Sequence, residues 1–344
     1  MGGSPSVGMP GMASSPRAGA SSPSGSASGT PRGWGSWSSS SAGMPLGTGS
    51  GSLSRSRSRI MATPYPARPD STRRLSVPTI TFLSDYGTSD EFVGVCHGVI
   101  ARLCPAARVI DLTHGIGRHD VRSGALALRA ALPFMPAGVH LAIVDPEVGA
   151  QRRAVALRTG EEERLLVGPD NGLLDLAAER FGGAVEAVDI AHSRHRLEPV
   201  SATFHGRDLF APVAASLAAG APLAEAGDPL DPADLARLEL PSAHVENGTL
   251  VTHAVHSDRY GNVELDADHR HLSDFGLKLG MEVELEIGDR RVRGRYARTF
   301  AEVPAGAVLL YEDAQHVLAL AINRGSAARE LGLASDQELR VRKR

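Results

Sequence analysis

The sequence predicts an α/β fold, with an N-terminal mostly parallel sheet sandwiched by helices, followed by a smaller C-terminal antiparallel β-barrel domain. Between residues 78 and 220, short apolar runs alternate with segments of helical periodicity, which is typical of βαβ units. After a Pro- and Ala-rich stretch at 221–242 the apolar spacing shifts toward two, which indicates antiparallel strands. At 344 residues and 42% hydrophobic residues, the chain is long enough to bury two cores.

The first expected strand is Thr79–Ser84 (TITFLS), because it is a short apolar run rich in β-branched residues. A helix is expected over 90–103, where apolar residues recur at helical spacing and Pro105 follows the end. The other strands of this domain are expected at 109–113, 139–144, 154–158, 164–167 and 184–189. The other helices are expected at 121–132, 172–180 and 208–218.

The second domain is expected to consist of short strands with turn residues between them. These strands are expected at 249–255, 263–265, 281–287, 291–296, 307–311 and 317–322. We therefore divide the chain into a tail at 1–76, an α/β domain at 77–228, a linker at 229–242 and a β-barrel domain at 243–344.

The tail differs from the rest of the chain in composition and in charge. Residues 1–60 hold 19 Ser and 13 Gly and no acid, which predicts disorder. Residues 1–76 carry eight Arg against the single acid Asp70, whereas the whole chain has a net charge of −3. The body is therefore acidic and a poor nucleic-acid binder, because neutralising phosphates requires clustered Lys and Arg.

Two further classes of protein are disfavoured. No run approaches the roughly 18 apolar residues that span a bilayer, and the tail lacks the compact apolar stretch of a secretory signal. Cys96 and Cys104 are too few for a disulfide framework or a cysteine zinc site, so we expect buried thiols. These observations favour a cytoplasmic protein.

Acids follow two of the expected strands, where ligands of parallel sheets bind. Asp85 in Ser84-Asp85-Tyr86-Gly87 could accept hydrogen bonds from vicinal ribose hydroxyls, or it could cap the next helix. Asp145 begins Asp-Pro-Glu-Val-Gly, and Arg152 follows seven residues later, so that the two could face each other. That pair could also be a turn ion pair of little consequence.

Two loop-to-helix junctions carry further candidates. His205 in the segment SATFHGRD could reach a ligand, or it could be a capping or core histidine. Asp170 and Asn171 in PDNGLL could likewise be helix caps or ligand contacts.

The second domain contains the motifs DRYGN, at 258–262, and INRGSAA, at 322–328. An aromatic ring, an amide and backbone groups beside glycine suit a flat heterocycle such as adenine, although hairpin turns use the same residues. No His-x-x-x-His or Cys-x-x-Cys spacing lies near the candidates, so no metal is expected among them. The lack of a Gly-x-Ser-x-Gly elbow disfavours a serine hydrolase.

Taken together and in order, the motifs SDYG, VDPEVG-x-x-RR, PDNGLL, SATFHGRD, DRYGN and INRGSAA resemble the S-adenosyl-L-methionine hydroxide adenosyltransferase family. This resemblance runs from about Ile80 to Leu331. It implies an adenosine-forming S-adenosyl-L-methionine hydrolase, related to halogenating enzymes that act on the same substrate. It also implies a homotrimer whose sites lie between one subunit's first domain and its neighbour's second domain, and no metal or redox cofactor.

By position in the motifs, the resemblance assigns roles to twelve residues. Asp145, Arg152 and His205 match the water-activating triad, with Arg152 and a protonated His205 stabilising hydroxide and Asp145 orienting them. Asp85 matches the acid that holds the ribose hydroxyls. The other expected substrate-binding residues are Tyr86, Asp170, Asn171, Asp258, Tyr260, Asn262, Asn323 and Arg324.

The chain departs from the family pattern at two positions, with Glu147 where the family usually has glycine and Tyr86 where it has phenylalanine. A carboxylate at 147 that faced the bound water would oppose formation of hydroxide, whereas a solvent-facing one would have almost no effect. Two alternative functions stay open, a non-catalytic sensor of S-adenosyl-L-methionine and a halogenase of the same superfamily.

Overall fold

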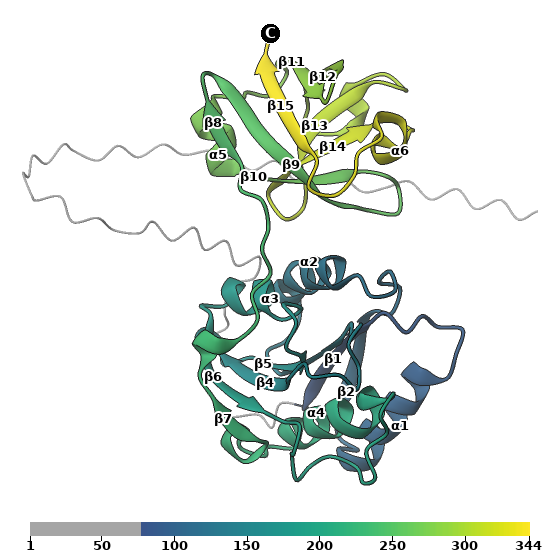
Figure 1. Ribbon diagram of the computed structural model, residues 1–344. Coiled ribbons are helices and arrows are strands. Elements are labelled where there is room, and N and C mark those ends of the chain that lie inside the picture. The colour runs from purple at the N-terminus through teal and green to yellow at the C-terminus, as the bar shows by residue number, and fades with distance from the viewer. Residues whose placement is uncertain (1–76) are drawn as a thin grey trace, which may run out of the picture. The chain divides into compact units, whose positions relative to one another are not determined.

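The first sheet contains seven strands in the order β2-β1-β3-β5-β4-β6-β7, in a computed structural model that describes residues 77–344 (Figure 1). The expected disordered tail lies outside these residues. The strands are β1 (Thr79–Ser84), β2 (Arg108–Thr113), β3 (Val139–Ile143), β4 (Ala154–Thr159), β5 (Leu165–Pro169), β6 (Ala184–Asp189) and β7 (Asp228–Leu230). Strands β2, β1, β3 and β5 pair in parallel, and β4, β6 and β7 pair antiparallel to their neighbours. The predicted parallel-rich sheet is therefore confirmed.

Helices cover both faces of this sheet (Figure 1). Helices α1 (Phe92–Leu103) and α4 (Ala211–Ala218) share one core with Phe82 and Leu141. Helices α2 (Val121–Ala131) and α3 (Asp175–Arg180) cover the other face. Successive strand residues enter opposite cores because side chains alternate across a sheet, so Phe82 faces one core and Leu83 the other. Burying each such side chain contributes about 1.5–3 kcal/mol.

The ends of β1 and β3 bring the first two candidate acids to the same edge. Ser84 pairs with Ile143 in parallel register, and the backbone N–H of Asp85 donates to the Ile143 carbonyl at 3.3 Å. Asp85 and Asp145 therefore follow neighbouring strands at their carboxyl ends, where the sequence predicted a ligand site.

The segment after α4 differs from the expected linker. It contains the short 3₁₀ turns η3 (Leu223–Glu225) and η4 (Pro232–Asp234), and between them β7 pairs with β6. Strand β7 is three residues long and carries Pro229, which suits an edge strand because proline cannot donate to a further neighbour. The first domain thus extends at least to Leu230. The remaining 3₁₀ turns are η1 (Leu132–Phe134) and η5 (Phe300–Glu302).

Seven strands of the second domain close into a barrel in the order β9-β10-β14-β13-β12-β11-β15, and β8 extends the sheet beside β9. Its strands are β8 (His244–Glu246), β9 (Thr249–Ser257), β10 (Val263–Asp268), β11 (Glu282–Ile287), β12 (Arg290–Tyr296), β13 (Val308–Glu312), β14 (Val317–Ile322) and β15 (Glu338–Lys343). All pairs are antiparallel except β12 with β13, which run parallel. Closure satisfies the edges that an open sheet would expose.

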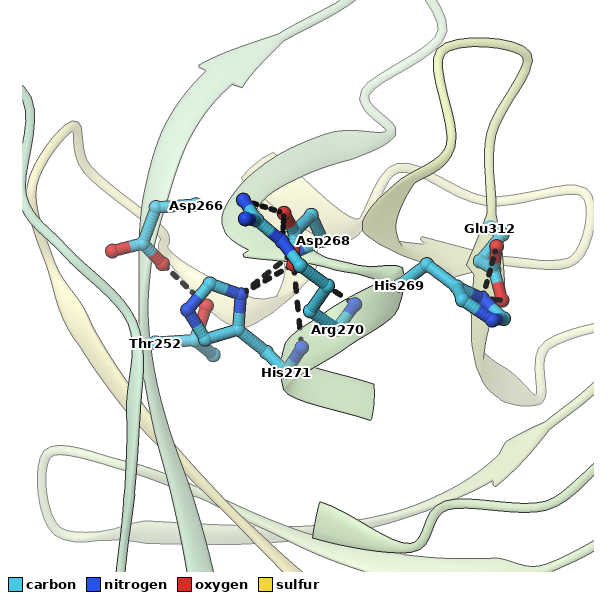
Figure 2. Close-up of polar contacts among 7 residues, drawn as sticks. All are labelled: Thr252, Asp266, Asp268, His269, Arg270, His271 and Glu312. Atoms are coloured by element: carbon cyan, nitrogen blue, oxygen red, sulfur yellow. Dashed lines mark hydrogen bonds and ion pairs between the residues drawn. The ribbon is translucent and has the colours of Figure 1, made fainter. Parts of the chain in front are cut away.

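Two short helices belong to the barrel, α5 (His269–Phe275) and α6 (Ala327–Leu331). The Asp268 carboxylate caps α5 by accepting the backbone N–H groups of Arg270 and His271 (Figure 2). Burial raises the pKa of Asp268, but hydrogen bonds from Arg270 and His271 outweigh it and lower that pKa to about 2. The side chain is therefore ionised at neutral pH, as a strong cap requires.

Among the helices at 77–344, none combines the length and apolar character that crossing a membrane requires. Cys96 and Cys104 are both buried free thiols, as predicted.

Candidate functional site

Asp145 and Arg152 form the centre of a buried polar cluster in the first domain. Arg152 Nε donates to Asp145 Oδ1 at 2.9 Å, and Arg152 Nη2 donates to Asp145 Oδ2. The side chains are only 4% and 6% exposed, so the pair is not the surface ion pair that sequence alone left open. A two-point contact of this kind fixes the guanidinium plane, and the Phe210 ring lies 5.3 Å from its central carbon.

His205 completes the cluster from the start of a π-helical turn, η2 (Gly206–Phe210), that leads into α4. Its Nδ1 lies 3.0 Å from Arg152 Nη2. Because a guanidinium only donates, this ring nitrogen accepts, and the neutral ring carries its proton on Nε2. Burial lowers the pKa of His205, and the charge of Arg152 lowers it further, against the opposing carboxylates of Asp145 and Asp208. The contact favours a neutral imidazole and not the protonated one expected from sequence.

The loops that carry these residues are fixed against each other. Gly149 has φ +77°, and a Cβ there would clash with the Ala202 carbonyl, so only glycine suits this approach. Asp208, which is 2% exposed, accepts the Ser201 N–H at 2.8 Å and a two-point contact from Arg207. These contacts hold the segment before His205 in place.

Tyr86 approaches the cluster from the end of β1. A Cβ on Gly206 would clash with the Tyr86 hydroxyl, which places that hydroxyl against the backbone next to His205. The Tyr86 ring lies 5.8 Å from the Phe92 ring and 6.0 Å from the Phe204 ring, both centroid to centroid. Burial raises the pKa of Tyr86 well above its usual range, so the phenol stays neutral. Tyr86, Phe92 and Phe204 thus form an aromatic wall beside the polar cluster.

Asp85 does not cap the following helix. The N-cap of α1 is Glu91, and Asp85 Oδ2 instead accepts the His119 backbone N–H at 3.0 Å. His119 has φ +65°, a left-handed conformation that aims this N–H at the carboxylate. The capping interpretation is wrong, and the carboxylate is oriented at the edge that also carries Asp145.

Glu147 is exposed and lies in a turn closed by the Ala150 N–H donating to its carbonyl at 2.9 Å. It takes no part in the contacts between Asp145 and Arg152. This placement favours the solvent-facing interpretation of the family departure.

The contacts of Asp170 and Asn171 are structural. Asp170 is 4% exposed, and its two oxygens accept from Arg153 Nε at 2.7 Å and from the Ala236 N–H at 2.8 Å. Asn171 donates to the Val144 carbonyl at 2.9 Å, which fixes the end of the chain segment that leads to Asp145. Both residues position the loops, and neither contact requires a ligand.

The candidates in the barrel form a separate group. Asp258 organises its own loop by accepting from the Tyr260 N–H at 2.8 Å and from Asn262 Nδ2 at 2.8 Å. A hollow of about 580 Å³ is lined by barrel residues alone: Ser257, Asp258, Arg259, Tyr260, Gly261, Arg324, Gly325, Ser326, Ala328 and Arg329. Tyr260 is 63% exposed, and the Arg259 guanidinium lies 4.7 Å from its ring centroid.

The two barrel loops meet where a Cβ on Gly261 would clash with Ser326. Arg324 has φ +61° and lines the hollow. Asn323 Nδ2 donates to the Val303 carbonyl at 2.8 Å, so that its amide supports the loop. Most motif residues of the barrel thus line one hollow, whereas Asn262 and Asn323 do not line it.

A second concentration of histidines and acids, on and around α5, has structural explanations (Figure 2). Asp268 caps the helix, Asp266 accepts from Thr252 Oγ1 at 2.5 Å, and Glu312 accepts from Tyr296 at 2.7 Å. These contacts stabilise the barrel and lie outside the candidate site.

Three residues with supporting positions were missed by sequence reasoning. Asp208 holds the loop before His205 by accepting the Ser201 N–H. The Phe210 ring lies against the Arg152 guanidinium, and Gly206 leaves room for the Tyr86 hydroxyl. Gly206 and Asp208 follow His205 by one and three residues in the SATFHGRD motif, which was the available signal. The contact of Phe210 with Arg152 depends on tertiary structure and has no local pattern.

Two family models match the chain, the SAM hydroxide adenosyltransferase N-terminal domain over residues 80–227 and the C-terminal domain over residues 252–340. The chain is 46% identical over 264 residues to an (R)-S-adenosyl-L-methionine hydrolase of Salinispora tropica, covering 77% of this chain and 97% of the relative. It is 39% identical over 270 residues to a Thermus thermophilus protein of the same name, covering 76% and 98%. A fluorinase of an Actinoplanes species is 27% identical over 277 residues, covering 73% and 93%.

A solved structure gives the same relationship at the level of the fold. The crystal structure of an uncharacterized conserved protein from Thermotoga maritima superimposes with a TM-score of 0.71 at 33% identity. It covers 76% of this chain and 99% of that one.

Proposed function

The chain belongs to the S-adenosyl-L-methionine hydroxide adenosyltransferase family and is an S-adenosyl-L-methionine (SAM) hydrolase, and we propose that Asp145, Arg152 and His205 direct water to the ribose C5′. The products are adenosine and L-methionine. The observation that carries this assignment is the buried contact chain from Asp145 through Arg152 to His205.

The reaction needs an oriented nucleophile more than an acid. The oxygen of water forms a bond to C5′ while the C5′–S bond breaks. The electron pair of the C5′–S bond stays on sulfur and neutralises the sulfonium, which gives the thioether of methionine. Because this leaving group departs uncharged, nothing has to protonate it. Water loses one proton, which passes to solvent, so the site must stabilise negative charge on the attacking oxygen.

Arg152 and His205 are suited to that task. The contacts of Arg152 with Asp145 and His205 involve Nε and Nη2, so Nη1 offers two further N–H donors. The neutral His205 offers its Nε2–H as a further donor. Each of the two residues therefore keeps an N–H group that can donate to a water or hydroxide. Arg152 is 4% exposed, and a charge in such a poorly solvated position interacts more strongly than one in bulk water. Asp145 holds the guanidinium in place and balances its charge.

We assign substrate positioning to Asp85, Tyr86 and the aromatic wall in the first domain, and to Asp258, Tyr260, Asn262 and Arg324 in the barrel. Asn323 acts by supporting its loop. Asp170 and Asn171 also act by supporting loops, because the contacts of both side chains are with other protein groups. Water and fixed protein groups supply all the chemistry in this scheme, so the proposed reaction uses no metal or redox cofactor.

We further propose a homotrimer in which the barrel of one subunit completes the first-domain site of its neighbour. The support is that the barrel residues line a hollow of their own, with an exposed Tyr260 ring suited to stacking on adenine. A ring of three subunits would provide three equivalent shared sites.

The function is tested by incubating the purified full chain with SAM and separating the products by chromatography. Both sulfonium epimers should be supplied, because the names of the hydrolase relatives specify the R form. Adenosine in amounts equal to methionine supports the hydrolase. Binding without turnover would instead support a sensor, and halide-dependent halo-deoxyadenosine would support a halogenase.

A further inference from the structure

A second group of convergent side chains lies outside the proposed catalytic cluster, at the edge of the first sheet. His97 comes from α1, Asp111 from the edge strand β2, and His114 from the loop directly after β2. His97 Nε2 lies 2.9 Å from Asp111 Oδ1, and His114 Nε2 lies 3.1 Å from the same oxygen. One carboxylate oxygen thus faces two imidazole nitrogens, and the three ligand atoms all lie within 4.8 Å of one another.

Hydrogen bonding accounts for only part of this arrangement. His97 makes a hydrogen bond to Asp111, whereas the 3.1 Å approach of His114 Nε2 has the distance of one but not the direction. The His114 side chain is only 5% exposed, and its Nε2 has no hydrogen-bond partner within residues 77–344. A buried nitrogen without a partner costs about 1–3 kcal/mol, so its position calls for an explanation.

We propose that His97, Asp111 and His114 form a binding site for one divalent transition-metal ion of the Zn²⁺ type. Two ligand atoms that each lie about 2.1 Å from a metal are about 3.0 Å apart at a right angle and about 3.4 Å apart in a tetrahedral site. The distances of 2.9 and 3.1 Å from Asp111 Oδ1 to the two histidine nitrogens agree with the right-angle value of about 3.0 Å. Two imidazoles with one carboxylate favour Zn²⁺, Co²⁺ or Ni²⁺ over Mg²⁺ and Ca²⁺, which prefer oxygen ligands.

The surroundings are those of a supported and accessible site. Ser84 Oγ lies 2.8 Å from His114 Nδ1, and accepting the proton of that nitrogen would leave the Nε2 lone pair free for the metal. The rings of both histidines pack near Phe82, at centroid distances of 4.7 Å for His114 and 6.1 Å for His97. The His97 and Asp111 side chains are 34% and 43% exposed, so water can reach the remaining coordination positions.

The site would connect α1 and β2 to the loop that carries Asp85 and Tyr86. Ser84 Oγ, which contacts His114, also accepts the Tyr86 N–H at 3.3 Å, and the His114 carbonyl accepts the Gly87 N–H at 2.8 Å. A bound metal would therefore hold this loop in place without entering the chemistry. The proposal does not depend on the function assigned above.

The test titrates chelator-treated full-length protein with Zn²⁺ by calorimetry, and with Co²⁺ to record the visible absorption of the bound ion. We expect one ion per chain, and a melting temperature that rises with Zn²⁺. His97→Ala and Asp111→Asn each change an exposed ligand, so they should fold normally and weaken Zn²⁺ binding at least about tenfold. Ser84→Ala should also weaken it, by roughly 10- to 100-fold.

The matched control is His269→Ala, because His269 is an exposed histidine 3.3 Å from a carboxylate of Glu312 and, within residues 77–344, belongs to no group of three candidate ligands. It should bind Zn²⁺ like the unchanged protein. The proposal is overturned if the unchanged protein binds no Zn²⁺, or if His97→Ala lowers the affinity less than tenfold or no more than His269→Ala does.

Discussion

Arg152 is the residue that contacts every other member of the cluster. It contacts the carboxylate of Asp145 and the imidazole of His205 at once, and it lies over Phe210. Because a guanidinium cannot accept a hydrogen bond, its contact with His205 decides which imidazole nitrogen carries the proton. The charge state of His205 therefore follows from a neighbour that is fixed in place.

The protonation of His205 predicts the shape of the pH–rate profile. Burial and Arg152 lower its pKa from the ordinary 6.5, so the neutral ring dominates at pH 7. As pH falls through the lowered pKa, the ring gains a proton on Nδ1, loses its contact with Arg152 and repels it. We expect kcat/KM to be level near neutrality and to fall only below pH 6.5.

His205→Gln provides the comparison for this profile. It should lower kcat/KM by about 10²-fold and remove the acid limb, since glutamine does not titrate. An acid limb centred above pH 6.5, or an unchanged limb in His205→Gln, would show that another group controls the profile.

The exposed position of Glu147 gives a second prediction about a single residue. Because its side chain is exposed on a turn, Glu147→Gly should leave turnover within about twofold and leave the pH profile in place, since an exposed charge interacts weakly with a buried site. The measurement is a pair of matched pH–rate profiles. A rise in turnover together with a rising limb shifted to lower pH would show that the carboxylate does act on the bound water.

At the scale of elements, the turn that begins at Gly206 brings Tyr86 next to His205. Gly206→Ala would place a methyl group against the Tyr86 hydroxyl and displace one of the two loops. We expect a loss in kcat/KM of roughly 10- to 100-fold, because displacements of about 1 Å cost that much in positioned sites.

A double variant keeps the new methyl group at 206 but removes the Tyr86 hydroxyl with which it clashes. In Gly206→Ala/Tyr86→Phe the nearest remaining ring atom would lie 3.2 Å from the new methyl, which small shifts can relieve. Most of the activity should return. A double variant as impaired as Gly206→Ala would mean that the hydroxyl of Tyr86 is not what excludes the methyl group, and that other neighbours such as Ile143, whose Cδ1 would lie 3.4 Å away, exclude it.

The bounds of several strands could be predicted from sequence patterns. Three of the predicted strands, β1, β6 and β14, have the expected bounds, because their apolar runs are flanked by turn residues. β7, β8 and β15 were missed, and β8 is only three residues long. The residues of β15 (ELRVRK) alternate but are mostly charged, and β7 contains a proline, so neither resembles a buried strand.

Some features of the candidate site could likewise be predicted from the sequence, and others could not. The positions of Asp85 and Asp145 at strand ends could be predicted from the expected parallel sheet. The grouping of Arg152 with His205 was expected from the positions of the family motifs. The neutral state of His205 and the structural use of Asp170 could not be predicted, because both depend on which atoms meet across loops distant in sequence.

For the whole molecule, the proposed sharing of sites between subunits predicts complementation between two impaired variants. Asp85→Ala damages the first-domain half of a site and Arg324→Ala the barrel half, so each protein alone should be impaired. Co-expressed, they should regain part of the activity, because some interfaces in mixed trimers pair two intact halves. Analytical ultracentrifugation measures the assembly directly, and a fully active monomer would exclude a site shared between subunits.

Attack of water at C5′ is tested by running the reaction in H₂¹⁸O and locating the label by mass spectrometry. Attack of water at C5′ predicts one ¹⁸O in the 5′ hydroxyl of adenosine and none in methionine. Arg152→Ala should form labelled adenosine at least about 10²-fold more slowly, whereas SAM binding should change far less. Label in a methionine-derived fragment, unlabelled adenosine, or an undiminished rate in Arg152→Ala would contradict the proposed role of this cluster.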